Sequence, residues 1–418
     1  MMNIFLLSTR AAEQNMTGTI LKSLLSEEAF STPTGRVVRA LSQRGTMSPR
    51  EIAESTGLAK STISTALTEL RRAGMVVDSA IESGRASGVG RPATAVSLNP
   101  EAGTCVGLLF GMSHIQMIVA DVSHQVIADR AFFLDPDYTP ETAATIAKRL
   151  VKEAYAEHGM SCGTLLGVGV AVAGPVNPQN GRVLRASGVP TWAGVNVKDV
   201  FETALKRPVF ADNESNCSAV AEMMWGAAVG HEDFVLFTLD LGVGGAIVHR
   251  GHVMTGIAGG AGEFGHMSID PEGPLCRCGN RGCLELYASF REPLELASKR
   301  FGRSMTLADV ITLAKDGDVG CRRLIEDTAE AAGRGLGIIG TAINPGLVVV
   351  GGRLAMASDL LVTPLEASFN KHTLVKRGDV GENCRTRFVV SKFAENDACM
   401  GAVGLVLRHF GRPELRYS

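Results

Sequence analysis

The sequence is poor in aromatic residues and has no long uninterrupted apolar run. Phe, Trp and Tyr make up only 5% of the 418 residues, whereas 48 residues are glycine. This combination is typical of α/β folds, which need many tight turns at strand ends. The longest weakly charged stretch, residues 335–352, is interrupted by several glycines and by Pro345. We therefore read it as a buried helix, turn and strand and not as a membrane span.

The sequence also shows no pattern of a secretion signal, and its cysteines are odd in number. The opening MMNIFLLSTR has too short an apolar run for a signal peptide and lacks a cleavage-like site. The nine cysteines are an odd number, and three of them form one tight cluster. This pattern favours free thiols and a metal in a reducing compartment over disulfides. We therefore expect a cytoplasmic protein with no membrane association.

Positive and negative charges nearly cancel over the whole chain, but they are unevenly distributed along it. The net charge is −2, yet residues 1–98 hold 11 Lys and Arg against 8 Asp and Glu, a net of +3. The remaining residues therefore carry 30 against 35, a net of −5. A basic first quarter on an acidic body is compatible with a nucleic-acid-binding head.

Residues 34–99 contain, in the right order, the elements of a winged helix-turn-helix. Ser48 and Glu51 have the spacing of a capping box and predict the start of a helix. Gly57 permits the turn before a second helix over Lys60 to Ala73, whose apolar residues recur every three or four positions.

The second helix offers short polar side chains and a cation at its N-terminal end: Lys60, Ser61, Thr62, Ser64 and Thr65. Such groups can enter a major groove and reach bases and phosphates. Two predicted strands, residues 75–82 and 94–98, flank a glycine-rich wing that carries Arg85 and Arg91. These arginines suit phosphate or minor-groove contacts. The alternative is a packing module with a solvated Ser/Thr face; the order of the elements favours double-stranded DNA as the partner.

The strongest local signal is a set of four possible metal ligands: His266, Cys276, Cys278 and Cys283. Three thiolates and one imidazole fill a tetrahedral shell without an open position, which predicts structural and not catalytic zinc. A group of buried free thiols is the alternative. The other six cysteines lie singly and are expected to be small core residues: Cys105, Cys162, Cys217, Cys321, Cys384 and Cys399.

Residues 100–418 resemble the ROK family, which joins repressors and sugar kinases on an actin-like (RNase H-like) fold. The motifs that carry this resemblance are LDLGVGGAIV, GEFGH, CRCGNRGCLE, GVAVAGPVNPQNGRV, ADNESNCSAVAE, NPGLVVVGG and NDACMGA. A winged helix in front of such a body resembles the repressors of the family, of the xylose and N-acetylglucosamine type.

The motifs that handle the nucleotide in the family's kinases are altered here. Where those kinases have a DxGGT turn, Leu109 replaces the carboxylate and Met112 replaces the second glycine. In the second phosphate loop, residues 240–244, Asp240 is expected to repel ATP. Glu214 stands at the position of the catalytic aspartate and could still serve as a base. Because phosphoryl transfer needs all these parts together, we expect no enzyme activity.

The resemblance implies that a sugar cleft between two lobes is partly kept. The residues that would line it are Asn213, Glu214, Glu263, His266 and Glu285. Carboxylates suit the neighbouring hydroxyls of a pyranose because each accepts two or more hydrogen bonds. His266 would bind zinc through one ring nitrogen and present the other toward the sugar. The sequence departs from the family at Gly188, where asparagine is common.

We therefore predict an α/β protein made of a winged helix-turn-helix and a two-lobed actin-like body. The expected parts are an arm (1–33), a DNA-binding domain (34–99), a first lobe (100–213, completed by 396–418) and a second lobe with zinc (214–395). The expected function is a sugar-responsive repressor of carbohydrate genes that binds a palindromic operator as a homo-oligomer. The alternatives are an active sugar kinase with a DNA-binding head, and a regulator controlled by a protein partner. A sugar or sugar phosphate is the expected effector.

Overall fold

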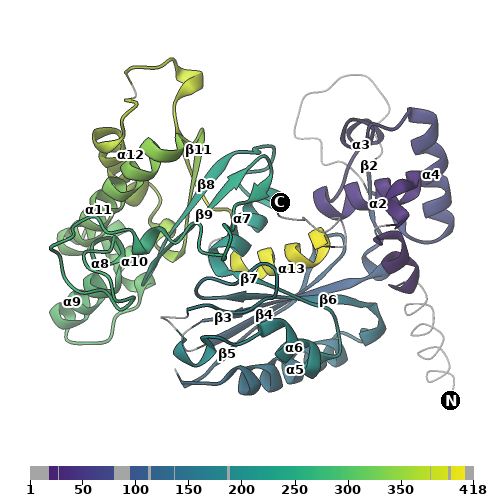
Figure 1. The fold of residues 1–418 in the computed structure, drawn as a ribbon, viewed down its shortest axis with the longest axis horizontal. Coiled ribbons are helices and arrows are strands. Elements are labelled where there is room, and N and C mark those ends of the chain that lie inside the picture. The colour runs from purple at the N-terminus through teal and green to yellow at the C-terminus, as the bar shows by residue number, and fades with distance from the viewer. Residues whose placement is uncertain are drawn as a thin grey trace.

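The computed structural model consists of a small N-terminal head and two sheet-containing lobes (Figure 1). Helices α7 and α13 lie between the two sheets. The structure describes residues 18–26, 28–79, 95–111, 114–135, 137–185, 189–376, 378–393 and 397–409.

The head is a three-helix unit followed by a two-stranded antiparallel sheet. Its elements are η1 (Glu28–Ser31), α2 (Pro33–Arg44), α3 (Pro49–Thr56), α4 (Lys60–Arg72), β1 (Val76–Ser79) and β2 (Ala95–Leu98). The Ser48 hydroxyl accepts a hydrogen bond from the Glu51 N–H, and the Glu51 carboxylate accepts one from the Ser48 N–H. This capping box confirms the predicted start of α3.

The segment before α2 packs into the head. For residues 1–33 the sequence predicts a loosely ordered arm with one helix, and residues 18–24 are helical. Leu21 and Leu25 from this segment are fully buried in the same apolar cluster as Val37 and Leu41 of α2. Residues 18–31 are therefore part of the packed head, because two leucines four positions apart lie on one face of a helical turn.

The first lobe is a five-stranded sheet with the order β5-β4-β3-β6-β7. Its strands are β3 (Thr104–Phe110), β4 (His114–Asp121), β5 (Val126–Phe133), β6 (Leu165–Val172) and β7 (Val209–Asn213). Helices α5 (Pro140–Glu157) and α6 (Val197–Leu205) cover one face, and α13 (Asp397–His409) covers the other. Three short helical turns complete the lobe: η2 (Pro100–Ala102), η3 (Cys162–Thr164) and η4 (Pro190–Trp192).

The second lobe repeats this topology with the order β10-β9-β8-β11-β12. Its strands are β8 (Phe234–Leu239), β9 (Val243–His249), β10 (His252–Val253), β11 (Leu347–Gly351) and β12 (Arg387–Val390). Counted from the first strand of each lobe, both sheets have the order 3-2-1-4-5 with the same parallel and antiparallel pairs. No repeat is visible in the sequence, so the duplication is one of topology.

The helices of the second lobe include two that the apolar periodicity of the sequence predicts, over 307–315 and 321–343. They are α7 (Glu214–Trp225), η5 (Phe264–His266), α8 (Glu285–Ala288), α9 (Arg291–Phe301), α10 (Leu307–Lys315), α11 (Val319–Ile343), η6 (Arg353–Ala357), α12 (Asp359–His372) and η7 (Glu382–Cys384). The same periodicity predicts a single helix over 284–301, and this prediction is wrong, because the chain breaks between α8 and α9. The N–H of Phe290 leaves the helical pattern there and donates to the carbonyl of Asp240, 2.8 Å away.

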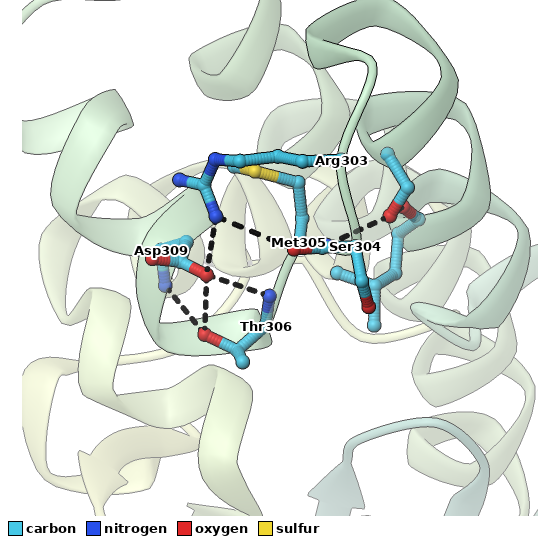
Figure 2. A network of polar contacts seen from close by, with 7 residues as sticks. Arg303, Ser304, Met305, Thr306 and Asp309 are labelled. Atoms are coloured by element: carbon cyan, nitrogen blue, oxygen red, sulfur yellow. Dashed lines mark hydrogen bonds and ion pairs between the residues drawn. The ribbon is translucent and has the colours of Figure 1, made fainter.

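The start of α10 shows how local side chains set helix boundaries in this lobe (Figure 2). The Asp309 carboxylate accepts hydrogen bonds from the N–H and the hydroxyl of Thr306, both at 2.8 Å. The Thr306 hydroxyl in turn accepts one from the Asp309 N–H at 3.1 Å, and Arg303 approaches the same carboxylate. These contacts satisfy N–H groups that have no partner within the helix.

Two further expectations concern the cysteines and the membrane. Cys105, Cys217, Cys321 and Cys399 are buried as expected, but Cys384 is exposed, because η7 lies at the surface; the side chain of Cys162 lies outside the described residues. In the described part of the chain, every helix is too short or too polar to span a lipid bilayer.

Candidate functional site

The recognition helix of the head, α4, presents most of the predicted polar residues to solvent. Lys60, Ser61, Ser64 and Thr65 are exposed and Thr62 is partly so, whereas Ile63 is buried in the head core. Thr65 also donates to the carbonyl of Ser61 at 3.2 Å. The N-cap of α4 is Ala59, whose methyl group cannot accept a hydrogen bond. The first N–H groups of α4 are therefore available to an external acceptor such as a phosphate.

The turn between α3 and α4 is held in place by α2. Gly57 adopts the left-handed conformation with φ of 67°, as its position in the sequence predicts. The Arg36 guanidinium from α2 donates to the carbonyl of Thr56, which precedes this turn. These contacts fix the direction in which α4 leaves the head. Arg85 and Arg91, predicted on the wing, lie outside the described residues.

The four predicted metal ligands come together in space. Their ligand atoms, one Nδ1 and three Sγ atoms, all lie within 4.8 Å of one another. The Sγ of Cys276 is 3.7 Å from Nδ1 of His266, and the Sγ atoms of Cys278 and Cys283 are 3.6 Å apart. Gly282, at φ of 59°, allows the loop to turn around this point, since a Cβ there would lie 1.6 Å from the Asp270 carbonyl oxygen.

The predicted sugar residues lie at the end of β7 and at or beside α7, η5 and α8: Asn213, Glu214, Glu263, His266 and Glu285. Asn213 ends β7 and caps α7: its side-chain oxygen accepts from the N–H groups of Ser215 and Asn216, at 2.8 and 3.3 Å. Its amide nitrogen donates to the carbonyl of Gly174 at 3.1 Å. These bonds give Asn213 a structural role at the start of α7.

Glu214, the first residue of α7, is surrounded by other carboxylates. Burial raises its pKa to about 7, and the nearby charges of Glu263, Asp397 and Asp240 add to the increase. Burial also raises the pKa of Glu263 to about 7, with a further contribution from Glu285. These groups belong to both lobes, so acids from the two lobes converge where the carboxyl ends of the strands meet.

Glu285 is buried and already has an internal partner. Its carboxylate lies 2.9 Å from the guanidinium of Arg277 and accepts a longer hydrogen bond, 3.4 Å, from the N–H of Val243. Arg277 stands between two of the predicted zinc ligands, and its positive charge also lowers the pKa of Glu214. Sequence reasoning missed Arg277, although its place inside the CRCG motif marks it as close to the site.

Asp240, which lies at the position of the kinases' second phosphate loop, forms an ion pair with Arg353. Asp240 accepts two hydrogen bonds from the Arg353 guanidinium, at 2.6 and 2.7 Å. The sequence predicts that Asp240 repels ATP, but its charge is balanced by Arg353. His114 of the first lobe faces this pair: burial lowers its pKa, and so does the charge of Arg353.

A further buried acid, Asp397 at the start of α13, was not predicted as a site residue. Burial raises its pKa to about 7 despite a hydrogen bond that its carboxylate accepts from the Ala398 N–H, 2.6 Å away. The NDACMGA motif contains this residue, so the signal was present. Leu109, in contrast, is an apolar strand residue as predicted, and Met112 and Gly188 lie outside the described residues.

Comparison with known proteins places these features in one family. The ROK family model matches residues 105–409, and the MarR family model matches residues 30–86. The chain is 28% identical to the xylose repressor of Bacillus subtilis over 375 residues, which covers 90% of this chain and 94% of the relative. It is 31% identical to a glucokinase of Halalkalibacterium halodurans over 259 residues, which covers 58% of this chain and 77% of the kinase.

A solved structure shows the same fold over nearly the whole chain. It is a ROK family transcriptional regulator, described as a homologue of the Escherichia coli Mlc protein. The TM-score is 0.69 at 21% identity, with 96% of this chain and 97% of that one covered. The head, the two lobes and their order are therefore shared with the fold of that regulator. The chain belongs to the ROK family and carries a MarR-like winged helix-turn-helix domain at its N-terminus.

Proposed function

We propose that this protein is a sugar-responsive DNA-binding repressor whose kinase-like body has lost phosphoryl transfer. The observation that carries the proposal is the combination of an exposed polar recognition helix with a phosphate loop closed by the Asp240–Arg353 ion pair. The relatives named as repressors match both head and body, which supports the regulatory role.

The loss of kinase activity follows from the state of both phosphate loops. Leu109 supplies no carboxylate for a metal-bound nucleotide, and Asp240 is engaged by Arg353. Glu214 remains as a possible base, but a base alone gives little rate without positioned phosphates. The purified protein should show no ATP-dependent phosphorylation of D-xylose or D-glucose above background. Turnover of about 1 s⁻¹ or faster, typical of working enzymes, would refute this part.

The donor set of the second lobe fits a structural zinc ion. A tetrahedral zinc with Zn–S bonds of about 2.3 Å separates its sulfur ligands by about 3.8 Å. The distance of 3.6 Å between the Sγ atoms of Cys278 and Cys283 is close to this value, and Nδ1 of His266 lies 3.7 Å from the Sγ of Cys276. His266, Cys276, Cys278 and Cys283 would hold the metal, and its charge would favour the thiolates. Its role is to fix the loop that carries Arg277 and leads into Glu285, and so one wall of the cleft.

The effector we propose is a neutral monosaccharide that binds among the carboxylates of the cleft. Glu214 and Glu263 have pKa values near 7, so each can donate or accept a hydrogen bond around neutral pH. Sugar hydroxyls do both as well, which makes a polyol a suitable partner. D-xylose and D-glucose are the first candidates, since the named relatives are a xylose repressor and a glucokinase.

One recognition helix covers too few base pairs for specific binding in a genome. We therefore propose a homodimer, located in the cytoplasm, that places two heads on a palindromic operator. In each head, Ser61, Thr62, Ser64 and Thr65 would read bases and nearby phosphates, and Lys60 would bind phosphate, as would Arg85 and Arg91 on the wing.

A single binding experiment tests the proposed function. A specific duplex is first selected from a random-sequence library with the full-length protein. Its dissociation constant is then measured with and without D-xylose or D-glucose at fixed salt, because protein–DNA affinity depends strongly on salt. We expect a change of at least fivefold with the effector. A sugar that binds but leaves DNA affinity unchanged would point to a regulator controlled by a protein partner.

Loss of zinc should be visible without any DNA. Protein purified without chelators should contain one zinc per chain by elemental analysis, and Cys283→Ser should lower this amount and the thermal stability of the second lobe. The matched control is Cys321→Ser, which changes a buried thiol of the same lobe far from the cluster in sequence. Protein without stoichiometric zinc, or equal zinc in both variants, would contradict the assignment.

A further inference from the structure

One imidazole connects the head, the first lobe and helix α7. His124 lies in the turn between β4 and β5 of the first lobe. Its Nε2–H donates to the carbonyl of Ser42 in α2 of the head, at 2.9 Å. On its other side, its ring lies 4.6 Å from the ring of Trp225, the last residue of α7. Three parts of the molecule therefore meet at a single side chain.

The surroundings of His124 form a fitted slot. Its backbone has φ of 77°, a left-handed conformation that costs energy for a residue with a side chain. Asp121 holds this turn by accepting hydrogen bonds from the N–H groups of Ser123 and Gln125, at 2.7 and 3.1 Å. A Cβ added to Gly45 would lie only 3.1 Å from Nδ1 of His124, so a glycine there leaves room for the ring.

The ring is neutral in this slot. Burial lowers the pKa of His124 to about 4, although the Ser42 carbonyl and the charge of Asp121 oppose the decrease. With one proton on the ring and Nε2 donating to Ser42, Nδ1 carries the lone pair. The indole Nε1 of Trp225 finds no acceptor among the described residues. The contact between His124 and Trp225 is therefore one of ring packing and depends on the position of Trp225.

Helix α7 links this slot to the sugar cleft. It begins at Glu214 and ends at Trp225, a length of about 18 Å at 1.5 Å per residue. Helix α7 packs closely against α13 at two glycines of α13. A Cβ at Gly401 would lie 1.7 Å from the Cys217 carbonyl oxygen, and one at Gly404 would lie 2.7 Å from Val220. Because no side chain separates the two helices at these points, a displacement at one end of α7 must move the whole helix.

The apolar core continues from this helix pair into the head. Met224 of α7 and Val403 of α13 belong to the same buried cluster as Val37 and Leu41 of α2. Figure 1 shows α13 running from the space between the lobes toward the head. The head is therefore joined to the helices that border the sugar cleft through a shared core. A movement of α7 changes the surface on which α2 rests.

We propose that His124 is a positioning residue that couples occupancy of the sugar cleft to the orientation of the DNA-binding head. Sugar contacts at Glu214 shift α7, Trp225 moves with it, and the His124 ring passes the shift to α2 through the Ser42 carbonyl. This inference rests on the proposed function, since it describes how the same cleft controls the same head. Coupling of this kind is reciprocal: operator binding must change sugar affinity by the same factor.

The experiment measures a thermodynamic cycle in the full-length protein. The dissociation constant of the selected DNA duplex is determined with and without saturating D-xylose or D-glucose, for the wild type, His124→Asn and His158→Asn. Asparagine tolerates positive φ, so the turn is kept while the ring contact is lost. His158 is the matched control, because it lies in the same lobe and, among the described residues, its ring bonds only to the Ala154 carbonyl of its own helix, at 3.0 Å.

The expected coupling factor is about 5- to 150-fold for the wild type and for His158→Asn. For His124→Asn it should fall to within about twofold of one, while the protein still binds both sugar and duplex. An unchanged factor in His124→Asn would overturn the inference and leave the proposed function intact. A factor of one in the wild type with sugar bound would overturn both. If His124→Asn does not fold, Trp225→Leu replaces it. This variant removes the ring contact on the other side of His124 and should lower the coupling factor in the same way.

A second measurement needs no sugar. Hydrogen exchange of the α2 amides, residues 36–44, is compared between wild type and Glu214→Gln, and again between the same two chains carrying His124→Asn. Neutralising Glu214 perturbs the cleft end of α7, so protection of α2 should change in the first pair and stay constant in the second. Equal changes in both pairs, or no change in the first, would overturn the inference.

Discussion

Replacing Glu214 with glutamine should stabilise the sugar-free protein, by an amount that grows as pH rises from about 4.5 to about 7. The carboxylate of Glu214 is partly buried and lies near Glu263, Asp397 and Asp240. An ionised carboxylate in such a place loses hydration and is repelled by like charges. Glutamine has nearly the same shape and no charge. The substitution therefore removes an unfavourable charge that the wild type keeps for its ligand.

The size and the sign of the effect follow from the raised pKa. The pKa of Glu214 rises from 4.5 to about 7 in the folded chain. Between these values the folded chain binds a proton that the unfolded chain has released, so stability decreases as pH rises. At roughly 1.4 kcal/mol per pH unit, the loss amounts to at most about 3 kcal/mol above pH 7. This loss of stability affects the wild type and not Glu214→Gln.

Thermal unfolding at pH 5 and pH 8 measures this difference. For a lobe of this size, about 1 kcal/mol shifts the midpoint by roughly 2–4 °C. Glu214→Gln should thus unfold up to about 10 °C higher than the wild type at pH 8 and nearly with it at pH 5. Glu153→Gln, on the exposed side of α5, is the control and should show no pH-dependent gain. A variant no more stable than wild type at pH 8 would refute the reasoning.

Two further predictions concern the head and the helix pair. Lys60→Ala should weaken binding to every duplex and reduce the slope of log affinity against log salt by about one, whereas Thr62→Ala should change the preferred bases in a library selection. Equal behaviour of the two variants would argue against their assigned contacts. Gly401→Ala should destabilise by about 1–3 kcal/mol or more in urea, because the new Cβ meets the Cys217 carbonyl oxygen at 1.7 Å. Gly346→Ala, where a Cβ meets no described atom within 4 Å, should not.

Features defined by neighbouring residues were predictable from the sequence. The capping box at Ser48, the turn at Gly57 and helix α10 all depend on contacts within a few positions. The break after α8 was not predictable, because the apolar periodicity continues through it. What ends α8 is the Phe290 N–H bonding to Asp240, a residue from another part of the lobe. Burial of Leu21 likewise depends on a partner helix that the local sequence does not reveal.

The candidate site also contains one feature that the sequence predicts and one that it does not. The three cysteines lie within one loop and His266 is ten residues away, so their spacing alone predicts a cluster. The partner of Asp240 is Arg353, 113 positions later, and only the fold brings the two together. The charge of Asp240 alone leads to the prediction that it repels ATP. The local sequence does not reveal that the Arg353 guanidinium balances this charge.

The ion pair at the former phosphate loop also bears on regulation. A sugar kinase closes its lobes over two ligands, so its closure depends on sugar and nucleotide together. Under the proposed function, the Asp240–Arg353 pair would occupy the nucleotide side, and the sugar alone would set the angle between the lobes. The free energy of closure is then available to move α7 and, through the shared core, α2. Operator occupancy is thereby expected to follow the sugar concentration and to be independent of ATP.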